Sequence, residues 1–62
     1  MSNIATKRKE KGILQDELAK EMGIDRSTVA KWETGAAMPR ADKLLKLAEI
    51  FECSVDDLLK EA

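Results

Sequence analysis

The stretch "DRSTVAKWETG", residues 25–35, predicts a short helix whose two sides differ in chemistry. At about 100° per residue, Val29 and Trp32 share one apolar side. The opposite side carries three polar residues: Ser27, Lys31 and Thr34. Arg26 stands at the first turn and is long enough to reach that polar side. We expect the apolar side to face a core. The polar side should face outward, on a helix narrow enough for the major groove of B-DNA.

Glycine and proline divide the rest of the chain into five predicted helices. Gly12, Gly23 and Gly35 each follow a helix-like stretch, where a left-handed C-terminal cap favours a residue without Cβ. Pro39 can separate two helices without breaking either. The helices are predicted at residues 2–11, 15–22, 26–34, 41–51 and 54–60. Because no segment alternates in the manner of a strand, the predicted fold is an all-α, compact five-helix bundle.

Apolar side chains at helical spacing predict which residues form the core. The expected core residues are Leu18, Ala19, Met22, Val29, Trp32, Leu44, Leu47, Ala48, Phe51 and Cys53. Met38, in the loop before Pro39, is expected to be exposed.

The predicted helix starts differ in how well they are capped. Asp25 is a plausible N-cap, and Ser54 with Asp57 three residues later is a variant of the capping box. Leu14 and Arg40 stand before two other helices, where neither offers the usual short capping side chain.

The helices predicted at 15–22 and 26–34 are joined by "GID", residues 23–25. A connection this short favours steeply crossed helices over an antiparallel pair. Gly23 can supply the turn conformation, and Ile24 can fill the space between the helices. This arrangement is the helix-turn-helix motif, whose second helix protrudes.

Length and composition limit the functions that this chain can have. Its 62 residues indicate one domain, 1–62, with a formal net charge of −1. A single cysteine excludes an internal disulfide and fits a reducing, cytoplasmic setting. The absence of histidine argues against a zinc site, and we expect no metal, no cofactor and no enzyme activity. No apolar run is long enough to span a membrane, so no membrane partner is expected.

The segment "GILQDELAKEMGIDRSTVAKWETGAAMP" resembles the helix-turn-helix of the Xre family, the group of phage Cro and repressor-like DNA-binding domains. "LLKLAEIFECSVDDLL" is similar to the family's two following helices, so the resemblance covers roughly residues 4–59. The matching positions are Arg8, Gln15, Leu18, Ala19, Gly23, Ile24, Ser27, Thr28, Val29, Trp32, Glu33, Gly35 and Pro39.

The resemblance implies roles for individual residues. Arg26, Ser27 and Lys31 fall on positions that read bases. The positions that contact the DNA backbone are Gln15, Thr28, Thr34 and Arg40. Arg8 and Glu33 are similar to an ion pair that ties the first helix to the third. The alternative to DNA contact for Arg26 is an ion pair with Glu33 or Asp25. The alternative for Lys31 is a solvated side chain without a DNA contact.

The chain departs from the family pattern at several positions. Lys7 stands where leucine is frequent, and Leu14 replaces the usual Ser or Thr cap. Glu52 replaces a small residue or Asn at a left-handed turn. The "AAM" of residues 36–38 lacks the polar or basic residues common in that loop, which implies fewer phosphate contacts.

These observations predict sequence-specific binding of double-stranded DNA by a transcriptional regulator or repressor. One such module has a small footprint, so a homodimer on an inverted-repeat operator is expected. Residues 49–62 hold five acids and one base and should face away from DNA. The expected dimer surface lies at this end: Leu45, Ile50, Val55 and Leu59. The alternative is a protein-interaction module, such as an antitoxin or antirepressor partner, on the same scaffold.

Overall fold

The computed structural model describes residues 3–59, which form five α-helices and no strand. The helices are α1 (Ile4–Glu10), α2 (Gln15–Met22), α3 (Arg26–Thr34), α4 (Ala41–Phe51) and α5 (Val55–Leu59). The all-α prediction is confirmed, and α2, α3 and α4 have the predicted bounds. The first and last helices are shorter than predicted, because Lys11 is the C-cap of α1 and Ser54 precedes α5. Residues 2 and 60, the predicted outer ends of these helices, lie outside the described residues.

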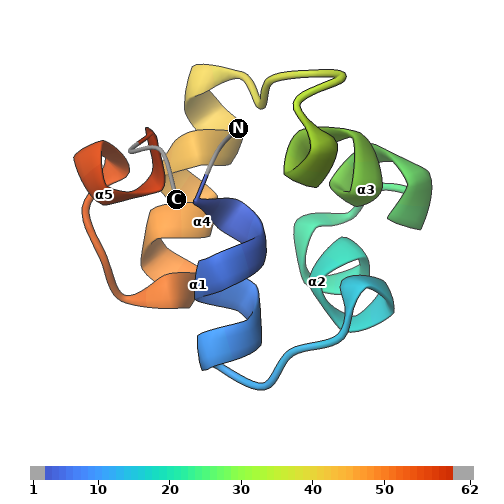
Figure 1. Cartoon of the computed structure of the whole chain (residues 1–62), viewed down its shortest axis with the longest axis horizontal. Helices are drawn as coiled ribbons and strands as arrows, with labels where there is room; N and C mark the ends of the chain where they lie inside the picture. Colours follow the sequence, from blue (N-terminus) through green and yellow to red (C-terminus); the bar gives the residue numbers. More distant parts are fainter. Residues whose placement is uncertain (1–2, 60–62) are drawn as a thin grey trace.

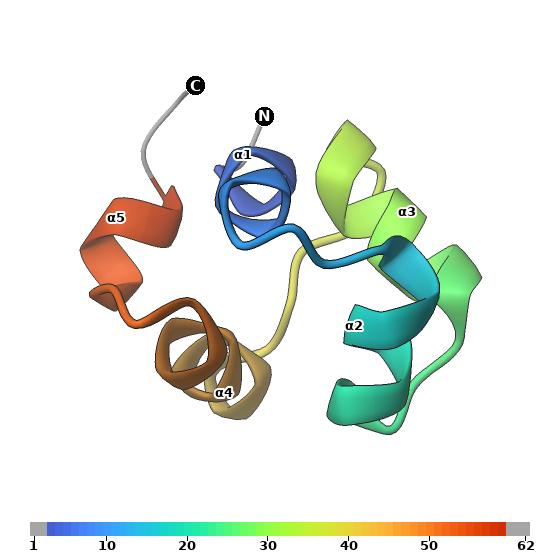
Figure 2. The same cartoon turned by 90° about the horizontal axis from the view of Figure 1, so that it is seen from below.

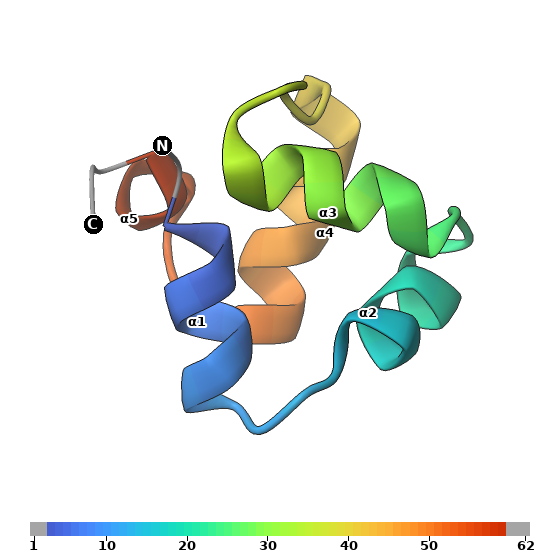
Figure 3. The same cartoon turned by 45° about the vertical axis from the view of Figure 1, so that its right-hand side comes forward.

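The helices surround a central core, with α2 and α3 at one end of the molecule and α5 at the other (Figure 1). Viewed from below, α1 lies between these two groups (Figure 2). The start of α1 is tied to α5, because Asn3 Nδ2 donates to the carbonyl of Asp57 at 3.1 Å. The backbone N–H of Asn3 also donates to the carbonyl of Leu58 at 3.0 Å. The short turn between α2 and α3 leaves α3 lengthwise along the outside of the molecule (Figure 3).

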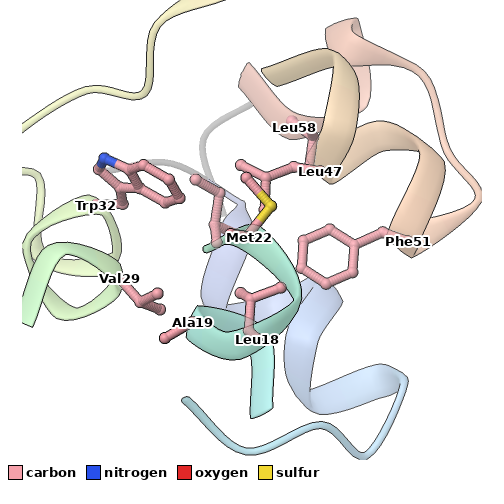
Figure 4. Packing of buried hydrophobic residues seen from close by; sticks show 9 residues of the cluster. Leu18, Ala19, Met22, Val29, Trp32, Leu47, Phe51 and Leu58 are labelled. Carbon is pink, nitrogen blue, oxygen red and sulfur yellow. The ribbon is translucent and has the colours of Figure 1, made fainter. Parts of the chain in front are cut away.

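All five helices contribute side chains to the core, most of which Figure 4 shows. The buried apolar residues are Ile4, Leu18, Ala19, Met22, Val29, Trp32, Leu47, Phe51 and Leu58. Leu44, Ala48 and Ile24 are partly buried against this cluster. Cys53 was expected in the core but is only half-buried, because it follows the turn after α4 at the edge of the cluster. Met38 is exposed, as expected.

The turns after the helices follow the predicted glycine pattern, with one addition. Gly12, Gly23 and Gly35 have φ angles of 69°, 69° and 85°, in the left-handed region. Glu52 also adopts this conformation, with φ 55° and ψ 46°, although it has a Cβ. The left-handed turn that the resemblance implies at this position is therefore present. Lys11 forms an ion pair with the Glu52 carboxylate and lowers its pKa, so this turn is tied to the end of α1.

The helix starts differ in which group, if any, caps them. Leu14 has no polar side chain, but its backbone N–H donates to Glu17 Oε1 at 2.8 Å, which supplies half of a capping box. Asp25 occupies the N-cap of α3 with extended backbone, but its side chain makes no capping hydrogen bond. The prediction of Asp25 as the N-cap residue is therefore confirmed by position, although its carboxylate does not cap the helix. Ser54 does cap α5, since Oγ accepts from the Asp57 N–H at 3.1 Å.

None of the helices described over residues 3–59 is both long enough and apolar enough to cross a membrane.

The turn between α2 and α3 gives a direct test of this fold. An added Cβ at Gly23 would meet no atom within 4 Å, so only the left-handed backbone opposes a side chain there. We expect Gly23→Ala to lower the free energy of unfolding by about 1–2 kcal/mol. Gly23→Asn should cost less, because Asn tolerates the left-handed conformation. Urea unfolding of both variants checks this, and equal losses would contradict it.

Candidate nucleic-acid interface

The outer side of α3 presents most of the residues that the resemblance assigns to DNA. Arg26, Ser27, Lys31 and Thr34 are exposed, and Thr28 is half-buried. On the inner side, Val29 is fully buried and Trp32 retains 4% of its exposure. Burial of these two apolar side chains fixes which side of the helix faces outward. The predicted division of α3 into an inner and an outer side is therefore confirmed.

The Glu33 carboxylate joins three helices. Arg8 Nε of α1 donates to Glu33 Oε2 at 2.6 Å, and Arg8 Nη2 donates to Oε1 at 3.4 Å. Gln15 Nε2 of α2 donates to the same Oε1 at 2.9 Å. Both members of the ion pair are largely buried, with 11% and 9% of their side chains exposed. Glu33 thus links α3 to Arg8 of α1 and to Gln15 at the start of α2, and so fixes the positions of these helices relative to α3.

Each of the three guanidinium nitrogens of Arg8 donates a hydrogen bond. Besides the two bonds to Glu33, its Nη1 donates to the carbonyl of Ile13 at 2.7 Å, in the turn before α2. Burial of a charged group is costly unless it is paired and hydrogen-bonded, and here both conditions are met. Among the described residues, no buried side-chain nitrogen or oxygen lacks a partner.

Gln15 connects this buried network to the outer side of α3. Its Oε1 accepts a hydrogen bond from Arg26 Nε at 3.3 Å, while its amide nitrogen is bound to Glu33. Asp16 Oδ1 lies 3.7 Å from the same Arg26 nitrogen. The ion-pair partner of Arg26 is therefore Asp16, and the alternative that paired it with Glu33 or Asp25 is wrong. Arg26 is the first residue of α3, so its side chain lies beside the start of α2.

The residues expected to contact the DNA backbone differ in whether their polar groups already have partners within the protein. The Thr34 hydroxyl donates to the carbonyl of Lys31 at 3.2 Å, so its only proton is used within its own helix. Arg40 is exposed at the N-cap of α4. It lines a shallow hollow together with Thr28 and with Lys43, a cation that the sequence analysis did not select. Among residues 3–59, neither Arg40 nor Lys43 has an ion-pair partner.

Lys43 and Asp16 are the polar neighbours that sequence reasoning missed. Lys43 stands three residues after Arg40, so the helix period places the two cations on one side of α4. That spacing could have identified it. Asp16 follows Gln15 directly, but only the placement of α2 beside α3 brings it to Arg26.

The opposite end of the molecule is apolar and acidic. Leu45 and Leu59 are exposed to 61% and 47%, and Ile50 and Val55 are half-buried. Leu45 lines an open hollow with residues of α4 and the following turn: Ala48, Glu49, Glu52, Cys53 and Ser54. The helix α5, at this end, lies far from α3 (Figure 1). Among residues 3–59, no group of acidic or cysteine side chains could hold a metal ion.

Comparisons with known proteins agree with this geometry. A family model described as helix-turn-helix matches residues 4–58. The HTH-type transcriptional activator BcrR of Enterococcus faecalis is 31% identical over 49 residues, which cover 79% of this chain and 24% of the relative. The cryptic phage CTXphi transcriptional repressor RstR of Vibrio cholerae is 34% identical over 55 residues, 89% of this chain and 49% of the relative.

A third relative is an uncharacterized HTH-type transcriptional regulator of Archaeoglobus fulgidus. It is 36% identical over 47 residues, which cover 76% of this chain and 67% of the relative. The chain therefore spans about a quarter and about half the length of the first two relatives, and two thirds of the third.

Removal of one member of the Arg8–Glu33 pair should destabilise the domain strongly. Arg8→Met would leave the Glu33 carboxylate buried without its cation, and we expect a loss of about 3 kcal/mol in the free energy of unfolding. Arg8→Lys should lose less, because the charge is kept. As a control, Lys7→Met removes the longer Lys7–Glu10 pair on the same helix and should cost under about 1 kcal/mol. Equal losses for Arg8→Met and Lys7→Met, measured by urea unfolding, would contradict the account.

Proposed function

The chain belongs to the helix-turn-helix family, and from this premise we propose that residues 1–62 form one domain that binds double-stranded DNA sequence-specifically and acts as a transcriptional regulator or repressor. In this proposal α3 enters the major groove and reads bases, while neighbouring elements contact the backbone and set its register. One observation carries the proposal. The polar, cationic side of α3 is exposed, while its apolar side is buried in the core.

Base reading is assigned to Arg26, Ser27 and Lys31. Arginine and lysine can donate to guanine O6 and N7, whereas a serine hydroxyl can donate or accept and so favours no single base. The exposure of all three residues on α3 supports this assignment. The anchoring of Glu33 supports it too, because α3 then presents these side chains from a fixed position.

Backbone contact is assigned to Gln15, Thr28, Thr34 and Arg40. The N-termini of α2 and α3 carry partial positive charge, which favours phosphate near Gln15 and Arg26. Arg40, with no ion-pair partner among residues 3–59, has its whole charge available for phosphate. Lys43 lines the same hollow and adds a second cation. Thr34 would have to turn its hydroxyl away from Lys31 before donating to phosphate.

A homodimer is proposed through the C-terminal region, so that two copies of α3 reach half-sites about one helical turn, roughly 34 Å, apart. Exposed Leu45 and Leu59, with half-buried Ile50 and Val55, supply apolar surface for it. This surface lies far from α3 in the fold, so the proposed dimer would not cover the reading side of α3 (Figure 1).

Selection of duplexes from a random pool by the purified protein tests the function directly. Recovery of an inverted repeat, with affinity that falls steeply as salt rises, supports the proposal, because phosphate contacts release counterions. Recovery of no preferred sequence would overturn it. Failure to bind any duplex at low salt would favour the protein-interaction module instead.

Substitutions should separate base reading from backbone contact. Lys31→Ala should change the preferred base at one position, with a discrimination loss of about 1–3 kcal/mol. Arg40→Gln should weaken binding to all sequences alike and reduce the salt slope by about 1. We prefer Arg40 to Gln15 for this test, since Gln15 also bonds Glu33 and Arg26. Binding measurements with Lys46→Ala, which removes an exposed charge from α4, provide the control. An unchanged base preference in Lys31→Ala would reject the assigned reading side.

A substitution in the proposed dimer surface should change the oligomeric state rather than the base preference. Leu45→Glu should shift the protein to monomer in sedimentation equilibrium, because the new charge would be buried at the interface. Its affinity for the full inverted repeat should fall at least about tenfold, while that for an isolated half-site stays unchanged. Leu45→Met, which conserves size and polarity, should behave as the unaltered protein. A Leu45→Glu protein that remains dimeric would place the interface elsewhere.

A further inference from the structure

Asp16 faces the arginine at the start of the proposed reading helix, and the proposed function gives it no role. Its Oδ1 lies 3.7 Å from Arg26 Nε, and about two thirds of each side chain is exposed, 68% and 66%. Gln15 Oε1 accepts a hydrogen bond from the same nitrogen at 3.3 Å. Two neighbouring residues of α2 thus approach a single edge of one side chain on α3.

The position of these contacts on the guanidinium group has a chemical consequence. Both involve Nε, whereas Nη1 and Nη2 of Arg26 have no hydrogen-bond partner among residues 3–59. A guanidinium group donates to guanine O6 and N7 through two nitrogens that form a fork. With its inner edge held by the protein, Arg26 keeps its terminal fork for a base.

Electrostatics explain why an acid is useful at position 16. Arg26 is the first residue of α3, where the partial positive charge of the helix N-terminus disfavours a cation. The first turn of α3 contains no acidic residue. Asp16 stands in the first turn of α2, where the same effect favours an anion. Asp16 therefore adds, from a neighbouring helix, a second carboxylate to that of the N-cap residue Asp25 at the start of α3.

An exposed ion pair contributes little in water, but its environment changes on binding. Contact with DNA would exclude solvent around Arg26, and the attraction between the two charges strengthens as the local dielectric constant falls. The same carboxylate would repel nearby phosphates. Asp16 therefore has two expected effects, a more fixed Arg26 and a weaker attraction to DNA of any sequence.

We propose that Asp16 is a positioning residue for base recognition: with Gln15 it holds the Nε edge of Arg26, so that this side chain offers its terminal nitrogens to a base in one orientation. Asp16 thereby lowers the affinity for arbitrary duplexes and increases the discrimination between bases. This inference rests on the proposed function, because it assumes that Arg26 reads a base.

The first experiment compares Asp16→Asn with Glu21→Gln. Glu21 is exposed on the same helix and has no ion-pair partner among residues 3–59, so both variants remove one negative charge. Fluorescence anisotropy measures binding to the selected duplex, its single-base variants and a random duplex. Asp16→Asn should raise affinity for the random duplex about two- to fivefold and reduce the preference at one base position by a similar factor. Glu21→Gln should leave the base preference unchanged.

A double-mutant cycle with Arg26→Gln separates positioning from general charge. If Asp16 acts through Arg26, then Asp16→Asn should alter no base preference in the Arg26→Gln background. The inference is overturned if Asp16→Asn leaves the preference of the unaltered protein intact, or if it changes preference equally in both backgrounds. If the unaltered protein shows no sequence preference at all, the proposed function fails first, and this inference fails with it.

Discussion

The orientation of α3 depends on one buried carboxylate. Glu33 accepts hydrogen bonds from Arg8 on α1 and from Gln15 on α2, so a single anion holds α3 against both neighbours. Because Glu33 adjoins buried Trp32 in sequence, the apolar contact and the ion pair fix the same rotation of the helix. Buried ion pairs often add little net stability, since desolvation offsets attraction. The value of this pair therefore lies chiefly in the position that it imposes.

The small size of the domain makes this constraint important. The five helices have 5 to 11 residues, and isolated helices shorter than about 12–15 residues are marginal in water. Their stability must come from packing around the shared core, in which Leu18, Val29, Leu47 and Leu58 are completely buried. Residues in the left-handed backbone conformation at the helix ends allow the sharp turns that this packing needs. Glu52 shows that such a turn can form without glycine, here with its side chain paired to Lys11.

Much of the fold was predictable because it depends on local signals. Helix period, with glycine positions and Pro39, gave the bounds of α2, α3 and α4, and the apolar stripe identified Val29 and Trp32 as core. The prediction failed where partners come from separate elements. The Arg26 partner is Asp16 rather than Glu33 or Asp25, because the identity of the partner depends on how α2 and α3 pack. The cap of α2 was missed for another reason: a leucine stands at its N-cap, and the partner of the Leu14 N–H is Glu17, three residues later in the same helix.

Spatial separation lets one small chain carry two kinds of surface. The exposed cations of α3 are proposed to face bases and Arg40 to face phosphate, while Leu45 and Leu59 are proposed to face a second copy. The net charge of −1 therefore says little about the proposed DNA side. The most direct test is a map of backbone amide chemical-shift changes when the selected duplex is added to isotope-labelled protein. The account predicts the largest changes along α3, at Gln15 and near Arg40. Largest changes confined to the outer side of α4 and to α5 would contradict it.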